Sequence, residues 1–172
     1  MSGVSIIIPA AGIGSRMNFP MAKQFFVLEG MPVLLHLLKR VGMVEDIDEV
    51  IVALRENEVE EFNENVLKEA GLDKSVKTVI GGATRQESVA NALKELSADS
   101  EVVMVHDAVR PLVTPNILQS AIDTTRELGA TVAAVATKDT IKEVKDGVVV
   151  RTLDRSSLYW FRPRDLLILL QK

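Results

Sequence analysis

A loop of small residues followed by two cations is the stretch of this sequence best suited to chemistry. Gly12 and Gly14 frame the loop, Arg16 follows closely, and Lys23 comes seven residues after Arg16. Backbone N–H groups can close around an anion where no Cβ blocks their approach. A planar guanidinium and a mobile ammonium both suit phosphate oxygens. The stretch therefore predicts a phosphate-binding loop, and a tight turn with two surface cations is the plainer alternative.

Two familiar glycine-rich loops do not fit this stretch. The dinucleotide fingerprint needs a third Gly or an Ala where Met17 stands. A P-loop needs Gly-Lys-Ser or Gly-Lys-Thr, which the loop lacks.

A second glycine-rich segment, residues 81–88, has the pattern of a strand exit that leads into a capped helix. Its two leading glycines allow close approach of a backbone, and Thr84 and Glu87 have the spacing of a capping box. A helix that begins here carries Arg85 and Ser88 in its first turn, where backbone N–H groups face an anion. The alternative is that the glycines only end the strand and that Glu87 only completes the cap.

An acidic residue follows a later apolar run. Asp107 comes directly after the segment 101–105 and His106, and a carboxylate at such a position is suited to holding Mg²⁺ on a nucleotide. Asp107 is therefore the metal candidate; alternatively it caps the local turn or pairs with Arg110. We expect His106 to be a structural hydrogen-bonding residue.

Two polar clusters flank a weakly alternating segment late in the chain. Thr140 can donate its hydroxyl group and Arg155 suits a second phosphate. Because residues 140–153 turn at 145–147 as a β-hairpin would, the two clusters should lie close together. Pairing of surface polar side chains across the hairpin is the alternative.

The elements that must position these residues alternate between apolar strands and amphipathic helices. Their pattern predicts a three-layer α/β domain with a mostly parallel, twisted sheet covered on both faces. In such sheets ligands bind beyond the carboxyl ends of the strands, where the loops described above would meet. The predicted strands are 4–9, 49–54, 76–80, 101–105 and 130–136, and the predicted helices are 32–43, 57–70, 84–96 and 115–128.

Composition narrows the class of protein. The chain has 172 residues, 47% of them apolar, which fits one domain over 1–172 and argues against disorder. Its 20 Lys and Arg against 24 Asp and Glu give a net charge of −4, which argues against a nucleic-acid partner. No run of residues is long enough to span a membrane. The absence of Cys agrees with a reducing compartment, so we expect a cytoplasmic protein.

Taken in order, the motifs resemble the 2-C-methyl-D-erythritol 4-phosphate cytidylyltransferase family. A sister family, CDP-ribitol pyrophosphorylase, usually has Ala-Gly-Gly in the first loop, where this chain has Ala10-Ala11-Gly12. The matching segments are Pro9-Ala-Ala-Gly-x-Gly-x-Arg-Met17, Lys23-Gln24, Gly81-Gly-x-x-Arg85 with Ser88, His106-Asp-Ala-x-Arg-Pro111, Asp139-Thr-x-Lys142 and Thr152-x-Asp-Arg155.

The resemblance implies a Rossmann-like nucleotidyltransferase fold with a late β-hairpin arm, over about 138–155, that interlocks a homodimer. It implies that the triphosphate of CTP lies against Gly12, Gly14, Ser15, Arg16 and Lys23. It implies that cytosine and ribose lie against Ala10, Ala11, Gly82, Ala83 and Ser88. It implies that Asp107 lies near Mg²⁺ and the ribose or substrate, and that Arg110, Thr140 and Arg155 contact methylerythritol phosphate, partly from the partner subunit. Arg16, Lys23 and Arg155 would be the catalytic residues.

The implied reaction joins two polyanions. An anionic phosphate oxygen of methylerythritol phosphate attacks the α-phosphorus of CTP in line and pyrophosphate leaves, so positioned cations matter more than a strong base. Two other functions stay open: a non-catalytic remnant that binds CTP, and a cytidylyltransferase for another polyol phosphate such as ribitol 5-phosphate.

The chain departs from the family pattern at three places. Ala22 stands where the family usually has Pro before Lys-Gln, and Ala83 stands where several members have Asp. After Trp160 the family continues Gln-Thr-Pro-Gln, whereas residues 161–172 form an atypical tail.

A one-base frameshift near residue 161 is our hypothesis for the tail, and sequencing of the coding DNA tests it. We expect its apolar part, Leu166–Leu170, to be an exposed, adhesive segment and the core to lose an edge.

Overall fold

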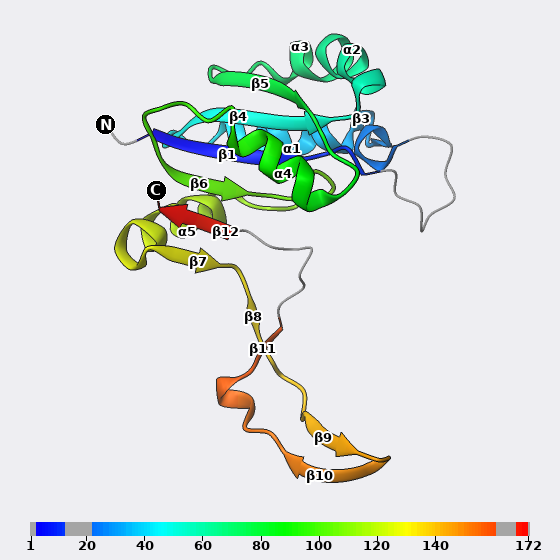
Figure 1. Ribbon diagram of the computed structural model, residues 1–172, viewed down its shortest axis with the longest axis vertical. Helices are drawn as coiled ribbons and strands as arrows, with labels where there is room; N and C mark the ends of the chain where they lie inside the picture. The colour runs from blue at the N-terminus through cyan, green and yellow to red at the C-terminus, as the bar shows by residue number, and fades with distance from the viewer. Residues whose placement is uncertain (1–2, 13–21, 161–167, 172) are drawn as a thin grey trace.

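A mixed six-stranded sheet carries the chain's small-residue loops at one edge (Figure 1). The computed structural model describes residues 3–12, 22–160 and 168–171, the last of these as backbone. The strand order is β5-β4-β1-β6-β12-β7. Strands β5, β4, β1 and β6 run parallel to one another, and β12 pairs antiparallel with both of its neighbours. The sheet strands are β1 (Gly3–Pro9), β4 (Ile47–Leu54), β5 (Ser75–Ile80), β6 (Ser100–Val105), β7 (Ala130–Val132) and β12 (Ile168–Gln171).

Alternate side chains of each central strand face opposite layers of helices. In β1, Ile6 and Ile8 join the larger apolar cluster and Ile7 joins the smaller one, and all three are fully buried. This alternation is the period of two of a strand buried on both faces. It confirms the predicted three-layer α/β class.

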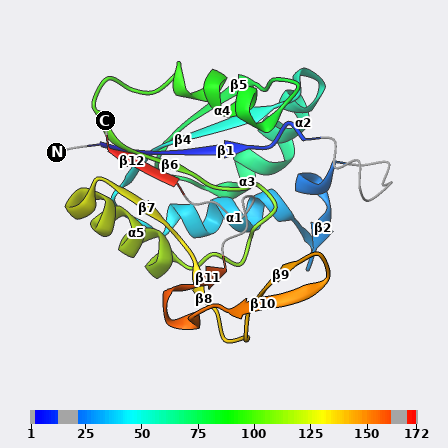
Figure 2. The same ribbon diagram turned by 60° about the horizontal axis from the view of Figure 1, so that its bottom comes forward.

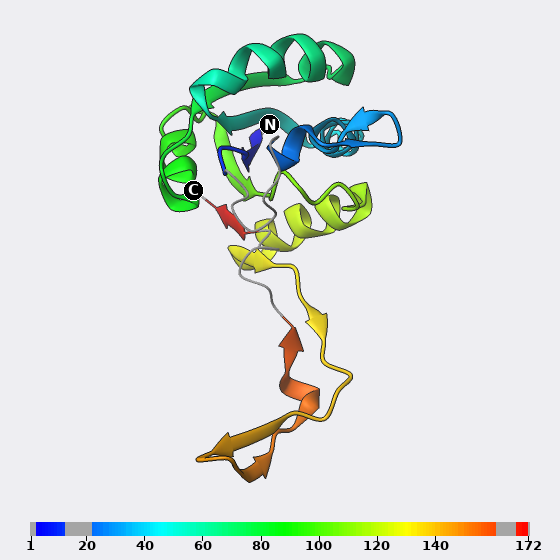
Figure 3. The same ribbon diagram turned by 90° about the vertical axis from the view of Figure 1, so that its right-hand side faces the viewer.

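The larger cluster lies under α1 (Val33–Gly42) and α5 (Pro115–Leu128), and the smaller one lies under α4 (Arg85–Leu93). Figure 2 shows α1 and α5 along one face of the sheet, and Figure 3 shows the green α4 on the other. The helix predicted over 84–96 ends earlier, at Leu93, whose side chain is exposed.

The predicted helix over 57–70 is a continuous helical segment with three geometries. It begins as the 3₁₀ helix η2 (Glu56–Glu58), continues through α2 (Val59–Phe62) and the π-helical turn η3 (Asn63–Leu67), and ends in α3 (Lys68–Ala70). Gly71, at φ 59°, closes it in the left-handed conformation that favours glycine.

The chain leaves the sheet after β7 and forms a projecting arm (Figures 1 and 3). The predicted strand 130–136 is divided, because β7 pairs with β12 whereas β8 (Val135–Ala136) pairs with β11 (Tyr159–Trp160). The arm ends in the expected antiparallel hairpin of β9 (Lys142–Lys145) and β10 (Val148–Thr152). Its turn places Asp146 and Gly147 at positive φ, as a tight hairpin turn requires. The arm also holds the 3₁₀ helix η4 (Arg155–Ser157).

The last residues of the apolar tail form a strand within the sheet. The backbone of β12 pairs with Val102–Val105 of β6 on one side and with Ala130–Val132 of β7 on the other. Because β6 and β7 have no direct pairing in this sheet, the tail supplies the backbone hydrogen bonds that join them.

Candidate active site

A hollow of about 360 Å³ lies beyond the carboxyl ends of β1 and β6, beside the first turn of α4. It brings together most residues that the sequence predicted for the nucleotide. Gly14, Ser15 and Arg16 lie outside the described residues. The predicted residues that line the hollow are Ala10, Ala11, Gly12, Lys23, Gly82, Ala83, Ser88 and Asp107.

The first wall of the hollow continues strand β1. The N–H of Ala10 donates to the carbonyl of Ala53 at 2.7 Å, so the chain leaves β1 still paired with β4. Lys23 opens the short 3₁₀ helix η1 (Lys23–Phe25), whose C-terminal neighbour Phe26 donates its N–H to the Lys23 carbonyl. This wall therefore combines small side chains with one ammonium group.

The second wall is the capped start of α4. Thr84 accepts a hydrogen bond from the N–H of Glu87, and the Glu87 carboxylate accepts from the N–H of Thr84, so the predicted capping box is confirmed. The buried hydroxyl of Ser88 accepts from the N–H of Gly82 at 3.1 Å and donates to the carbonyl of Thr84 at 2.9 Å. Ser88 thus holds the glycine turn against the helix, a role that sequence reasoning missed.

The two walls touch at Gly81. A Cβ at this position would lie 2.4 Å from the Cβ of Ala11 and 2.9 Å from the Oγ of Ser88. No carbon atom fits at 2.4 Å, so glycine is required for the two loops to meet.

Asp107 is the one carboxylate among the described residues that line the hollow, and its partner is Arg85. The guanidinium of Arg85 donates to Oδ1 of Asp107 from Nε at 3.1 Å and from a terminal nitrogen at 2.8 Å. The backbone N–H of Arg110 donates to the Asp107 carbonyl, so Arg110 also lies beside this residue. The signal for the true pair was that Arg85 and Asp107 each follow a strand at the same sheet edge.

A neighbouring hollow of about 320 Å³ shares Asp107 with the first and contains Arg110. His106 lines it, and its Nδ1 lies 3.0 Å from the carbonyl of Asp107. A carbonyl only accepts, so Nδ1 carries the proton. Burial lowers the pKa of His106 below its usual value, so the ring is neutral at pH 7. As expected, this histidine makes a structural hydrogen bond.

Thr140 and Arg155 lie on the arm and line neither hollow. The predicted proximity of the two ends of the hairpin is confirmed, because Arg155 donates to the carbonyl of Lys138 at 3.3 Å. Lys142 likewise donates to the hydroxyl of Thr152 at 2.6 Å.

The residues around the first hollow fit a metal ion carried by a nucleotide better than one held by the protein alone. Over residues 3–12 and 22–160, no group of three acidic or histidine side chains is arranged to hold an ion. Mg²⁺ in nucleotide sites typically takes one or two carboxylates together with phosphate oxygens and water. One carboxylate, Asp107, at the edge of the hollow meets that requirement.

The sequence matches the model of the family described as 2-C-methyl-D-erythritol 4-phosphate cytidylyltransferase over residues 4–163. The chain belongs to this family. A cytidylyltransferase of this name from Syntrophus aciditrophicus is 41% identical over 157 residues, which cover 91% of this chain and 67% of the relative. One from Bacillus mycoides is 40% identical over 90% of this chain and 67% of its own length.

Solved structures of the cytidylyltransferase family have the same fold. The 4-diphosphocytidyl-2C-methyl-D-erythritol synthase from Anaerococcus prevotii matches with a TM-score of 0.81 at 30% identity, over 98% of this chain and 70% of that one. The cytidylyltransferase from Francisella tularensis matches with a TM-score of 0.70 at 29% identity, over 99% of this chain and 73% of that one. In the part of the chain that the structure describes, no helix has the length and apolarity to cross a bilayer.

Proposed function

We propose that this chain transfers the cytidylyl group of CTP to 2-C-methyl-D-erythritol 4-phosphate and releases pyrophosphate, a step of isoprenoid precursor synthesis. The observation that carries the proposal is the hollow between the β1 loop, Lys23 and the start of α4, in a chain that belongs to the family over residues 4–163. Small side chains and backbone form two walls of this hollow, a lining that suits a flat base and a phosphate chain.

The reaction requires the protein to position two anions, CTP and the acceptor phosphate, and to stabilise the charge that develops on the phosphate oxygens. A phosphate oxygen of the acceptor attacks the α-phosphorus of CTP, a new P–O bond forms, and the bond to pyrophosphate breaks. The nucleophile is already anionic, so the reaction needs no strong general base. Neither the neutral His106 nor Asp107, which is paired with Arg85, has to act as one. Lys23, together with Arg16, would hold the triphosphate and stabilise the charge that develops on its oxygens.

Asp107 would hold Mg²⁺ on the nucleotide. When bound, the ion supplies Lewis-acid stabilisation of the phosphate oxygens. The present pairing with Arg85 orients the Asp107 carboxylate, and one oxygen, Oδ2, has no hydrogen bond among the described residues. The position of this carboxylate at the edge of the hollow supports the assignment.

The acceptor phosphate would lie in the second hollow, beside Arg110, and would receive Thr140 and Arg155 from the arm of a second copy. Two features support a homodimer built on the arm. Every residue of β9 and β10 is exposed, and so are the large apolar side chains Tyr159 and Trp160. Exposed apolar surface on this scale is typical of an interaction site. A cytoplasmic location stays a prediction from the sequence.

The test is turnover by the purified chain with CTP, methylerythritol phosphate and Mg²⁺. We expect equal amounts of pyrophosphate and CDP-methylerythritol, identified by mass, and loss of both when the divalent ion is removed with EDTA. CTP binding without turnover would contradict the proposal in favour of a non-catalytic remnant. Faster turnover with ribitol 5-phosphate would contradict the assigned acceptor.

A further inference from the structure

At the first wall of the hollow lies a polar cluster of the buried residues Gln24 and Glu58 and the partly exposed Arg55, to which the proposed reaction gives no role. Gln24 itself contributes to the lining of the hollow. Gln24 is 2% exposed, and its Nε2 donates to the carbonyl of Ala10 at 2.5 Å. The same nitrogen lies 3.3 Å from each carboxylate oxygen of Glu58. Both partners only accept hydrogen bonds, so the orientation of the amide is fixed.

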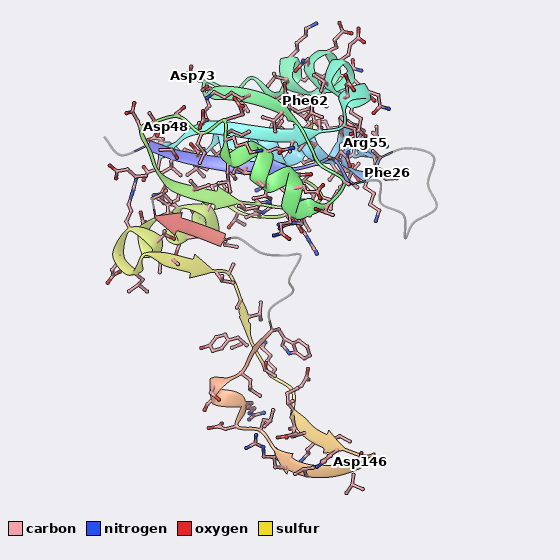
Figure 4. All side chains as sticks on the ribbon, viewed as in Figure 1. Phe26, Asp48, Arg55, Phe62, Asp73 and Asp146 are labelled. Carbon is pink, nitrogen blue, oxygen red and sulfur yellow. The ribbon has the colours of Figure 1, made fainter. Side chains whose placement is uncertain are left out.

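Glu58 is itself held in place from the far side. Its carboxylate accepts from the backbone N–H of Arg55 at 3.3 Å and forms an ion pair with the Arg55 guanidinium. Figure 4 shows Arg55 at the end of the sheet where β1 and β4 finish. The side chain of Glu58 is 5% exposed, whereas that of Arg55 is 35% exposed. The Glu58 carboxylate therefore lies in the interior, between the backbone of Arg55 and the side-chain amide of Gln24.

Gln24 connects the two chain segments that form the first wall of the hollow. Ala10 follows β1, Lys23 lies thirteen residues later on η1, and both line the hollow. The residue that ties them is the immediate neighbour of Lys23 in the chain. Because the lysine side chain is long and rotates freely, its ammonium group can be placed only as well as its backbone is placed.

We propose that Gln24 is a positioning residue for the transfer reaction, oriented by Glu58, that sets the backbone of Lys23 relative to the Ala10 carbonyl of the nucleotide wall. The proposal rests on the proposed function, because it acts through Lys23. Stabilisation of a transition state depends on charges that are already in place, and small displacements of such a group reduce the rate strongly.

Gln24→Met tests the proposal because Met has nearly the volume of Gln and lacks the amide. We expect kcat for pyrophosphate release to fall between about tenfold and a hundredfold, the range for a small misplacement of a catalytic group. In a chain that already carries Lys23→Ala, we expect Gln24→Met to have no further effect on kcat. A merely structural role would instead reduce kcat by the same factor in both backgrounds.

Ser5→Ala is the matched control. It removes another buried hydrogen bond, from Ser5 Oγ to Glu49 at 2.6 Å, at the opposite end of β1. We expect its kcat to equal that of the wild type. Thermal unfolding of Ser5→Ala and Gln24→Met measures how much stability each lost hydrogen bond contributes.

A second pair of variants serves if Gln24→Met does not fold. Glu58→Gln still offers an oxygen to the Gln24 amide, so we expect most of the kcat to be retained. Glu58→Met offers none, and we expect a clearly larger loss of kcat at equal CTP concentration.

The outcomes separate the two proposals. A wild-type chain that releases no pyrophosphate overturns the proposed function, and this inference with it. The inference alone is overturned if the wild type is active and Gln24→Met has the wild-type kcat. It is also overturned if Gln24→Met lowers kcat by the same factor in the Lys23→Ala chain as in the wild type.

Discussion

Glu49 is a charged side chain inside the core of the fold that carries the site. Its carboxylate accepts hydrogen bonds from Ser5 at 2.6 Å, from Ser97 at 2.6 Å and from Lys77 at 2.7 Å. Burial by itself would raise its pKa, but these donors outweigh burial and lower the pKa to about 2. Figure 4 marks this end of the sheet with the neighbouring Asp48.

We therefore predict that Glu49 makes stability depend on pH in the acidic range. The folded chain keeps this group ionised where the unfolded chain, with a pKa near 4.5, has bound a proton. The stabilisation is complete above that value and disappears as the pH falls toward 2. Denaturant unfolding of wild type and Glu49→Gln should show a free-energy difference at pH 6 that shrinks by pH 3. A difference that does not change with pH would contradict the assignment.

Residue types at strand ends predicted part of the lining of the hollow, and the family resemblance supplied the rest. Gly12, Lys23 and Asp107 were predicted from small size or charge at one sheet edge, Ala10 was predicted only from the resemblance, and the structure places all four in one hollow. Their partners could not be predicted, because pairings such as Arg85 with Asp107 depend on the register of distant elements. Gln24 was noted only as part of the Lys23-Gln24 segment of the family pattern, and nothing in the sequence indicated its contacts with Ala10 and Glu58.

At the scale of elements, the two glycine-rich loops differ in what they need glycine for. Gly81 is in contact with the opposite loop, whereas no described atom lies within 4 Å of where a Cβ on Gly12 would stand. Gly12 lines the hollow itself.

This difference predicts opposite effects for two alanine substitutions. Gly81→Ala should lower the free energy of unfolding by roughly 1–3 kcal/mol, the usual cost of overpacking. Gly12→Ala should leave stability nearly unchanged and raise KM for CTP, because its methyl group takes space beside the phosphates. Thermal unfolding and CTP kinetics on both variants test this. Equal stability losses would show that the two loops are built alike.

Local patterns predicted the elements better than they predicted the pairings of strands. The capping box of α4, the end of the helix predicted over 57–70 and the hairpin turn depend on a few neighbouring residues and were found where expected. The split of 130–136 and the insertion of β12 depend on partners far along the chain. The apolar tail was expected to be exposed because it departs from the family pattern, and the partner strands of β12 could not be recognised from its residues.

At the scale of the whole molecule, Thr140 and Arg155 lie on the projecting arm and line neither hollow of their own chain (Figure 1). We predict that Arg155 acts in the site of a second copy. Chains carrying Lys23→Ala and chains carrying Arg155→Ala, each inactive alone, should recover activity when produced together. Half of randomly formed dimers are mixed and each has one intact site, so about a quarter of wild-type activity is expected.

The absence of recovery, with both variants folded and dimeric, would place Arg155 in the site of its own chain or outside the reaction. Dimer formation itself is measured by sedimentation of the wild type.

The most direct test of the account is the rate of pyrophosphate release from CTP and methylerythritol phosphate by wild type, Lys23→Ala and the matched surface variant Lys68→Ala. Lys68 is exposed on α3 and lines neither hollow. We predict that Lys23→Ala loses about two to three powers of ten in kcat while keeping its thermal stability, as when a preorganised donor is removed, and that Lys68→Ala is unchanged. A Lys23→Ala chain that turns over as fast as the wild type would contradict the assignment of this hollow as the site of cytidylyl transfer.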